Sequence, residues 1–305
     1  MFKIASSYDR QDSVHVEWNL GKRCNFDCSY CPAEIHDNTS PHTNIKVLID
    51  AVDALAETGK SMRVSFTGGE PCVHPQFTEL VDHASQRVDW INVTTNGTRT
   101  AKYYSDLNVN HIVFSLHVED DEHWRRCAET VLMFSQINEG YASPQKPFQV
   151  NLMAHHKFMD RVKECATMFD GHGIPYVVRR IRWTEGDHDV FDDLKYEGKD
   201  LEWILSKTST VEPNVIIDDK TKMHANDVIK KHLNQFEGWK CSAGIESLMI
   251  NWDGEVHRAT CRVGGSIGNI YDGSFEQPEE WITCTRKWCT CAADIPLTKV
   301  SDLVQ

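Results

Sequence analysis

Three cysteines with short spacing stand near the start of the chain. Cys24, Cys28 and Cys31 have three and then two residues between them. Three thiolates on one short loop can hold three corners of a cube-shaped iron–sulfur cluster. A zinc site usually takes four protein ligands, and no fourth cysteine lies nearby, although His36 and His42 are available to complete one. The spacing therefore predicts a metal site and favours a cluster over zinc.

A second group of five cysteines occupies the last 65 residues. They are Cys241, Cys261, Cys284, Cys289 and Cys291. Alternating residues around an Asp-Gly pair at 253–254 predict a β-hairpin that brings the first two of them together. Four thiolates suffice for a complete cluster. The sequence leaves open which four bind: the tail TCTRKWCTC favours the four that follow Cys241, with Cys241 close behind, and a structural zinc site is the alternative.

The other three of the 11 cysteines have plainer explanations. Cys165 falls on the apolar face of an expected helix, and Cys72 and Cys127 are expected to be small core residues. The N-terminus carries no apolar stretch of the kind that directs secretion. In a reducing compartment cysteines bind metals or react before they form disulfides. We therefore expect a cytoplasmic protein without disulfides.

Composition excludes several classes of protein. The 305 residues are 40% hydrophobic, which is enough for a substantial core and excludes a disordered chain or a small disulfide scaffold. No apolar run is long enough to span a bilayer. The 32 Lys and Arg residues are outnumbered by 45 Asp and Glu residues, for a net charge of −13. This charge argues against a protein that binds nucleic acid through phosphate contacts.

Short β-branched or aromatic runs alternate with amphipathic segments from about residue 14 to 182, which is typical of βα units in a parallel sheet. The expected strands cover 14–20, 63–67, 90–94, 112–116, 148–153 and 175–181. A helix is expected from Ile45 to just before Gly59, and another is expected to begin at Pro75. Six units are too few for a closed eight-stranded barrel. The sequence therefore predicts an α/β fold with a partial (βα)6 TIM-type barrel.

Residues 183–240 break this rhythm. Acidic residues dominate 185–202 and no strand pattern is visible, so we expect a bridging segment of helix or loop with a charged surface. The expected domains are the partial barrel over 1–182, the bridge over 183–240, and a small domain with a β-hairpin and many cysteines over 241–305.

Four short motifs follow successive expected strands. In chain order they are the cysteine loop, with Tyr30 before its last cysteine, then Gly68-Gly69-Glu70-Pro71, Thr95-Asn96-Gly97, and Ser115 with His117. In barrels of parallel strands the active site gathers at the carboxyl ends of the strands, where all four motifs would meet. In this order the motifs resemble those of the radical SAM superfamily, whose cysteine motif is CxxxCxxC.

The resemblance implies a role for each motif. The three cysteines would bind three irons of a [4Fe-4S] cluster, and S-adenosylmethionine would bind the fourth iron. Gly68 and Gly69 would let the backbone approach the cofactor, and Glu70 would accept a hydrogen bond from its ammonium group. Tyr30 would lie by the adenine, and Asn96 is a candidate for the polar groups of the cofactor.

Four more residues are candidates for the site. Two of them have two explanations each, and the role of the other two depends on which way their strand faces. Ser115 is a second candidate for the polar groups of the cofactor, or else packs against a helix. His117 lines a substrate cavity or makes a structural hydrogen bond. Arg180 and Arg182 share one face of the sixth strand, and one of them could clamp a carboxylate of cofactor or substrate if that face points into the barrel.

The C-terminal segment carries a second resemblance. The stretch CSAGIESLMINWDGEVHRATC, followed by Gly268-Asn269-Ile270, resembles the auxiliary-cluster domains of radical SAM enzymes, called SPASM or, when shortened, twitch domains. It departs from the longer type because six residues rather than four separate Gly254 from Cys261, and because five cysteines are too few for two clusters. One auxiliary [4Fe-4S] cluster of the twitch type is therefore expected.

Taken with its cofactors, the resemblance implies an enzyme. Such enzymes cleave S-adenosylmethionine reductively to a 5′-deoxyadenosyl radical, which abstracts a hydrogen atom from the substrate. An auxiliary cluster suits oxidation or cross-linking of a small molecule or peptide, and the expected reductant is a flavodoxin or ferredoxin. One alternative is radical modification of a nucleotide or nucleic acid. Another is a non-catalytic iron–sulfur or zinc electron carrier, which would have no use for the GGEP and Thr-Asn-Gly motifs.

Overall fold

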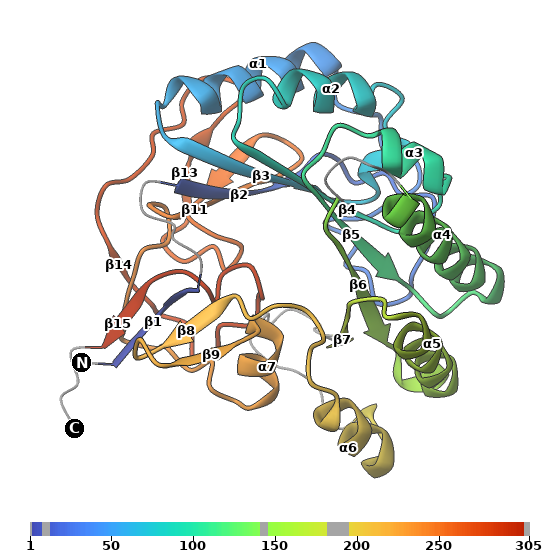
Figure 1. The fold of residues 1–305 in the computed structure, drawn as a ribbon. Coiled ribbons are helices and arrows are strands. Elements are labelled where there is room, and N and C mark those ends of the chain that lie inside the picture. The colour runs from blue at the N-terminus through green and yellow to red at the C-terminus, as the bar shows by residue number, and fades with distance from the viewer. Residues whose placement is uncertain (1, 8–12, 141–145, 182–194, 302–305) are drawn as a thin grey trace.

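The computed structural model describes residues 2–7, 13–140, 146–181 and 195–301. Its strands form two sheets, and helices cover the outer side of the larger one (Figure 1). The larger sheet has nine strands in the order β13-β12-β11-β2-β3-β4-β5-β6-β7, with β13 and β7 at its two ends. This open, curved sheet is the partial barrel that the sequence predicts.

Six neighbouring strands of this sheet run parallel. They are β2 (Ser13–Asn19), β3 (Ser61–Thr67), β4 (Trp90–Thr95), β5 (His111–Leu116), β6 (Phe148–Ala154) and β7 (Tyr176–Arg180). All six predicted strands are therefore confirmed, with bounds that differ from the prediction by a residue or two at most.

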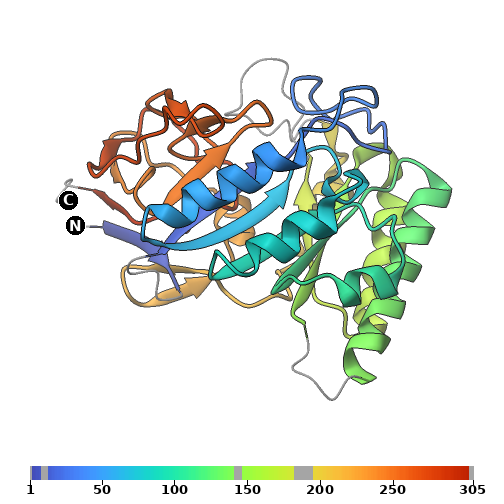
Figure 2. The same cartoon turned by 90° about the horizontal axis from the view of Figure 1, so that it is seen from above.

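Five α-helices connect these strands and lie along the outer face of the sheet (Figure 2). They are α1 (Ile45–Glu57), α2 (Phe77–Ala84), α3 (Ala101–Asp106), α4 (Asp121–Gly140) and α5 (Met159–His172). Helix α1 begins where predicted, because the Asn44 side chain caps it by accepting the N–H of Lys46 at 2.9 Å. The second helix begins at Phe77 rather than at Pro75, because the chain first makes a short 3₁₀ turn over Pro71–Val73.

The two faces of the parallel sheet differ in polarity, because side chains alternate along a strand. On β2, Val16 and Trp18 are fully buried in the core beneath the helices. The inner face carries polar side chains in register: Asn92 donates to the Ser65 hydroxyl at 2.7 Å, and its carbonyl oxygen lies 2.8 Å from Nδ1 of His111. A polar inner surface is thus built into the sheet.

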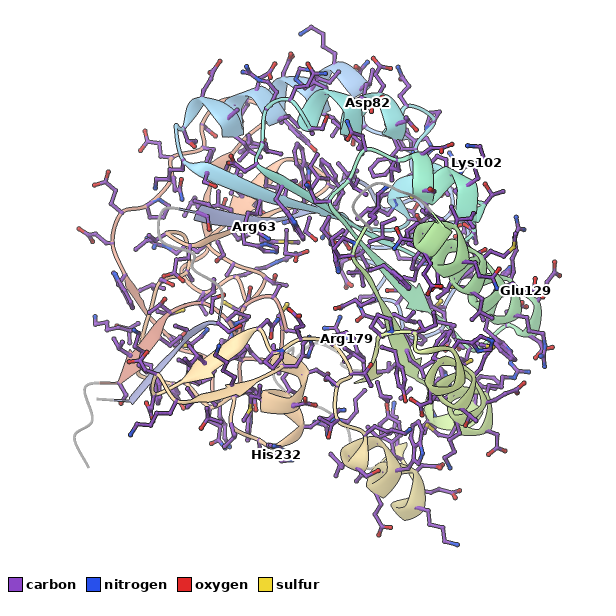
Figure 3. All side chains as sticks on the ribbon, viewed as in Figure 1. Arg63, Asp82, Lys102, Glu129, Arg179 and His232 are labelled. Carbon is purple, nitrogen blue, oxygen red and sulfur yellow. The ribbon has the colours of Figure 1, made fainter. Side chains whose placement is uncertain are left out.

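Charged residues follow the same division in Figure 3. Asp82, Lys102 and Glu129 lie on the outer helices, whereas Arg63 of β3 and Arg179 of β7 lie on the inner side. The Arg63 guanidinium lies over the Trp90 ring, 4.4 Å from its centroid. The inner surface therefore carries positive as well as neutral polar groups.

The second sheet has six strands and lies across from the inner face of the first (Figure 1). In spatial order they are β14 (Ile282–Thr283), β10 (Lys240–Cys241), β15 (Lys299–Ser301), β1 (Phe2–Ser6), β8 (Val215–Ile217) and β9 (Thr221–Met223). Strand β1 pairs antiparallel with both β15 and β8. The first residues of the chain thus belong to the sheet of the last ones, and not to the barrel strands that follow them.

The described part of 183–240 is mostly helix and loop, as the sequence predicts, but it also contains two short strands. Its described part contains the antiparallel pair β8 and β9 as well as α6 (Gly198–Ser206) and α7 (Ala225–Lys230). Each of the two strands has three residues, which is too short for an alternating pattern to be visible. The domain boundaries at 182 and 240 stay a prediction.

Three C-terminal strands extend the larger sheet beyond β2. Strand β11 (Ser247–Ile250) pairs with β2 in parallel, and β12 (Glu255–His257) and β13 (Ser266–Asn269) continue antiparallel. The predicted hairpin at Asp253-Gly254 is confirmed as the connection between β11 and β12. Gly254 has a φ of 86°, and a Cβ at that position would lie 2.3 Å from the Tyr271 ring.

No helix in the described part of the chain combines the length and the apolar character needed to cross a membrane.

Candidate active site

Cys24, Cys28 and Cys31 lie on the loop between β2 and α1, beyond the carboxyl end of β2. The N–H of Cys24 donates to the carbonyl of Asp37 at 2.8 Å, and the N–H of Cys31 donates to that of Cys28 at 3.0 Å. Burial raises the pKa of Cys24 to about 11 and the pKa of Cys28 and of Cys31 to about 12. Metal-free, the three thiols are protonated at neutral pH, so binding a metal releases protons.

The glycines at 68 and 69 make room for this loop. The N–H of Gly69 donates to the carbonyl of Gly21 at 2.8 Å. A Cβ on Gly69 would lie 2.3 Å from the Arg23 carbonyl oxygen, and one on Gly68 would lie 2.7 Å from that of Gly21. The resemblance implies that these glycines admit a cofactor, but the space beside their Cα atoms is filled by the backbone that leads into Cys24. Their conformational freedom serves the cysteine loop.

Glu70 joins the ends of β3 and β4. Its carboxylate is 3% exposed and accepts hydrogen bonds from the N–H of Cys72 at 2.9 Å, the Thr95 hydroxyl at 2.8 Å and the N–H of Asn96 at 2.6 Å. Burial raises the pKa of Glu70, and these donors lower it. The Cys72 side chain makes a fourth hydrogen bond with this carboxylate, so its acceptor positions, about four in number, are taken within the chain. The predicted bond to a cofactor ammonium group stays a prediction.

Asn96 contacts the first cysteine and its neighbour on the loop. Its amide nitrogen donates to the Asn25 side chain at 2.8 Å and lies 3.8 Å from the Cys24 sulfur, while its carbonyl oxygen accepts from the Thr98 hydroxyl at 2.8 Å. Together with the Glu70 contact, these bonds hold the end of β4 against the cysteine loop. The predicted contact between Asn96 and a cofactor stays a prediction.

Tyr30 and His117 form a pair at the carboxyl ends of the parallel strands. The Tyr30 hydroxyl makes a hydrogen bond with Nδ1 of His117, and the two rings stack with centroids 5.9 Å apart. Burial lowers the pKa of His117 to about 4, so its imidazole is neutral at neutral pH. The sequence left two explanations for His117, a structural hydrogen bond or a place in the substrate cavity, and the structure contains a hydrogen bond. Its position next to the cysteine loop also keeps it a candidate for the substrate side.

Two residues at this end of the sheet were missed by the sequence analysis. Glu119 accepts the N–H of Ser29 at 2.9 Å, inside the cysteine loop, and its carboxylate lies 3.2 Å from Nε2 of His155, a residue 1% exposed. His155 directly follows β6, and Glu119 lies shortly after β5, both at the carboxyl ends of these strands. That position was the available signal, because polar residues gather there in barrels.

Of the remaining residues predicted for the site, Ser115 and Arg180 are described, and neither is shown in contact with the cysteine loop. Ser115 is half-buried on β5, opposite Asn151 of β6. Side chains alternate between the two faces of β7. Val178 is buried beneath the helices, so Arg180 lies on that same face and Arg179 lies on the inner side. The predicted inward clamp therefore fits Arg179 better than Arg180, and Arg182 lies outside the described residues.

The second cysteine group gathers where the two sheets meet. Cys241 on β10 and Cys261, which follows β12, pack in one small apolar cluster, and Cys284 and Cys289 pack in its neighbour. Burial raises the pKa of Cys261, and the charges of Cys241 and Cys284 raise it further. Burial likewise raises the pKa of Cys289, with smaller contributions from Cys261 and Cys291. The hairpin thus brings Cys241 and Cys261 together, as predicted.

Comparison with known proteins identifies the family. The family described as Radical SAM superfamily matches residues 18–137. A GTP 3′,8-cyclase from Syntrophomonas wolfei subsp. wolfei is 35% identical over 276 residues, which cover 85% of this chain and 81% of that protein. The chain belongs to the radical SAM superfamily. The predicted family and enzyme class are confirmed, and with them S-adenosylmethionine and a [4Fe-4S] cluster as cofactors.

Two further proteins resemble most of the chain. A mycofactocin maturase from Mycobacterium ulcerans is 33% identical over 278 residues, covering 87% of this chain and 73% of that protein. The structure of Streptococcus suis SuiB bound to precursor peptide SuiA has the same fold, with a TM-score of 0.57 and 14% identity over 87% of this chain and 65% of SuiB. The chain spans 46% to 58% of the first curated relatives that it matches.

The residues present fit the radical SAM cofactors by their chemistry. Three half-buried thiols share one loop, as the cluster requires, and Glu70, whose N–H donates to the carbonyl of Arg23 on that loop, carries a carboxylate of the kind that suits an ammonium group. Each ligand of a cube-shaped cluster binds a different iron. Among the described residues, no group of three His, Cys, Asp or Glu side chains is placed to hold a single metal ion.

Proposed function

We propose that this radical SAM enzyme modifies a peptide, and that an auxiliary [4Fe-4S] cluster in its C-terminal segment takes up an electron from the substrate. S-adenosylmethionine at the first cluster, reduced by a flavodoxin or ferredoxin, would supply the radical that removes a hydrogen atom. The protein orients the reactants and keeps water out. The observation that carries the proposal is the second set of buried thiols, where the C-terminal segment meets the polar inner face.

The two cysteine groups lie toward opposite ends of the same strands. Strands β2 and β11 run parallel, with Val16 opposite Leu248. Cys24 follows the carboxyl end of β2, whereas Cys241 precedes β11 and Cys261 follows the returning strand β12. Figure 2 shows this separation between the blue loop and the orange to red segment. A substrate on the inner face between them could lose a hydrogen atom at one end and an electron at the other.

An electrostatic interaction between the C-terminal segment and the inner face supports the same proposal. Glu17 lies on the inner side of β2, between the buried Val16 and Trp18. Burial raises the pKa of Asp294, and the charge of Glu17 contributes to that shift. The group of residues around the second thiols therefore reaches the face on which a substrate would lie.

We infer that Cys241, Cys261, Cys284 and Cys289 bind the auxiliary cluster. Cys241 and Cys261 pack in one apolar cluster and Cys284 and Cys289 in the other, and the charges of Cys241 and Cys284 also act on Cys261. Cys291 lies beside Cys289 at the edge of the group. Spacing along the chain favours Cys291, whereas the burial of Cys241 on β10, opposite Lys299 of β15, supports Cys241.

Iron counts test this ligand set. Anaerobically reconstituted chain should hold about eight irons, as two four-iron clusters require. Cys241→Ala should hold about four, because a buried ligand is lost, whereas Cys291→Ala should keep about eight. Cys165→Ala, a buried thiol of α5, is the matched control and should also keep about eight. Zinc in place of half the iron would contradict the auxiliary cluster itself.

Nucleotide modification is the second candidate, and one observation favours it: the relative that is 35% identical is a GTP 3′,8-cyclase. The peptide is preferred because SuiB, which has the same fold over 87% of this chain, binds a precursor peptide. The net charge of −13 also disfavours a polyanionic substrate.

Product analysis separates the two candidates. The reconstituted chain should release 5′-deoxyadenosine from S-adenosylmethionine under dithionite. A pooled peptide library should raise that release and yield peptides that have lost hydrogen mass, while GTP in a parallel reaction should be recovered intact. Consumption of GTP with no change in any peptide would contradict the peptide proposal.

A further inference from the structure

A buried lysine lies inside the second cysteine group. Lys299 on β15 is 2% exposed and stands directly opposite Cys241 of β10 in the antiparallel pair. Its Nζ donates to the carbonyl oxygens of Asp294 at 2.6 Å and of Ile295 and Leu297 at 3.2 Å each. The ammonium group is thus fixed in position and removed from water.

Asp294 is the second buried charge in this group. It is 3% exposed, and its carboxylate accepts the N–H of Cys261 at 2.9 Å and that of Thr260 at 3.3 Å. The N–H of Asp294 in turn donates to the carbonyl of Cys291 at 3.1 Å. The carboxylate therefore holds the backbone of one proposed ligand, while Lys299 faces another across the sheet.

The charges around Lys299 indicate which groups Lys299 and Asp294 face. Burial lowers the pKa of Lys299, yet Cys289, Cys241 and Asp294 act against burial and hold it above its usual value. A buried cation is costly unless negative charge lies close by. Besides one carboxylate, the nearby groups able to carry negative charge are thiols, and a thiol carries it when it binds a metal. The surroundings of Lys299 thus suit metal-bound thiolates.

We propose that Lys299 and Asp294 set the reduction potential of the auxiliary cluster, with effects of opposite sign. Reduction adds one negative charge to the cluster. A fixed ammonium group nearby stabilises that charge and raises the potential, and a fixed carboxylate lowers it. This inference rests on the proposed auxiliary cluster and assigns both residues a positioning role, since neither binds iron.

Lys299 would thereby favour electron uptake from the substrate. A cluster takes an electron more readily when its potential is higher, and the buried site weakens the screening that water and salt would otherwise provide. The chain also provides a matched control. Lys230 of α7 is 7% exposed and donates to the carbonyl of Lys207, and its charged neighbours are Asp227 and Arg180 rather than thiols.

A redox titration followed by electron paramagnetic resonance tests the proposal. The full-length chain with Cys24, Cys28 and Cys31 replaced by alanine retains only the second site, so its signal is unmixed. In that background Lys299→Gln, which keeps a donor without the charge, should shift the midpoint potential to a more negative value. Asp294→Asn should shift it to a more positive value. Lys299→Arg and Lys230→Gln should leave it close to the parent.

The measured potentials decide between a role in setting the potential and a merely structural role. Equal potentials for Lys299→Gln and Lys230→Gln, or shifts of the same sign for Lys299→Gln and Asp294→Asn, would overturn the proposal, because a merely structural pair moves both variants alike. If Lys299→Gln fails to retain its cluster, Asp294→Asn decides: a positive shift supports the proposal, and a negative or absent shift overturns it. A parent chain without iron at this site would instead refute the auxiliary cluster, which is a different result.

Discussion

Replacement of Cys28 by alanine should reduce the release of 5′-deoxyadenosine to background. Cys28 is the middle ligand of the three on the first loop, and with two thiolates left the cluster has lost one of its three protein ligands. The fourth iron, at which S-adenosylmethionine would bind, is then no longer held in a fixed position. The measurement is chromatographic quantification of 5′-deoxyadenosine after anaerobic reconstitution and reduction with dithionite.

The matched control for this variant is Cys165→Ala. Cys165 is fully buried in α5 and belongs to the core beneath the helices, so its loss should cost some stability but leave the first cluster and its chemistry in place. Full cleavage by the Cys28 variant would remove this cysteine from the ligand set. Loss of cleavage in both variants would mean that destabilisation, and not ligand loss, explains the result.

Gly69→Ala should dislodge the first cysteine loop and destabilise the fold. The added Cβ would lie 2.3 Å from the Arg23 carbonyl oxygen and 2.5 Å from that of Lys22. These atoms belong to a backbone that is hydrogen-bonded to Gly69 and Glu70, so they cannot move without losing those bonds. The expected cost is about 3 kcal/mol in the free energy of unfolding. Urea denaturation and the iron content of the first site measure it.

Gly171→Ala provides the comparison. Gly171 lies in α5 with no atom within 4 Å of an added Cβ, so alanine should be neutral or stabilise the helix by up to about 1 kcal/mol. A Gly69 variant that matched it in stability and iron content would show that the loop can shift. The close approach of Gly69 to residues 22 and 23 would then lack a structural role.

Much of the partial barrel could be predicted from the sequence because its strands are long and regular. Their alternation of buried and inner residues is visible over five to seven positions, and each is followed by a helix with its own period. The motif residues could likewise be placed, because the carboxyl ends of neighbouring parallel strands lie together. Tyr30 and His117, 87 positions apart, do meet there.

What the sequence did not reveal depends on contacts between distant segments. The glycines of the second motif could be located but not explained, since nothing in the chain predicts that residues 21–23 would pack on them. Strands of two or three residues, such as β8 and β10, carry no periodic pattern. Lys299 looks like any surface lysine until β10 and β15 are paired.

The pairing of β1 with β15 has a consequence for the order of biosynthesis. Residues 2–4 are bonded in register with residues 299–301, so β1 waits for β15, which is made much later. The barrel strands, by contrast, each pair with a strand made within a few dozen residues. Contacts so distant along the chain close late in folding. The loop of the first cysteines can therefore find its place early in synthesis, while the site around Lys299 is completed only once β15 has been made.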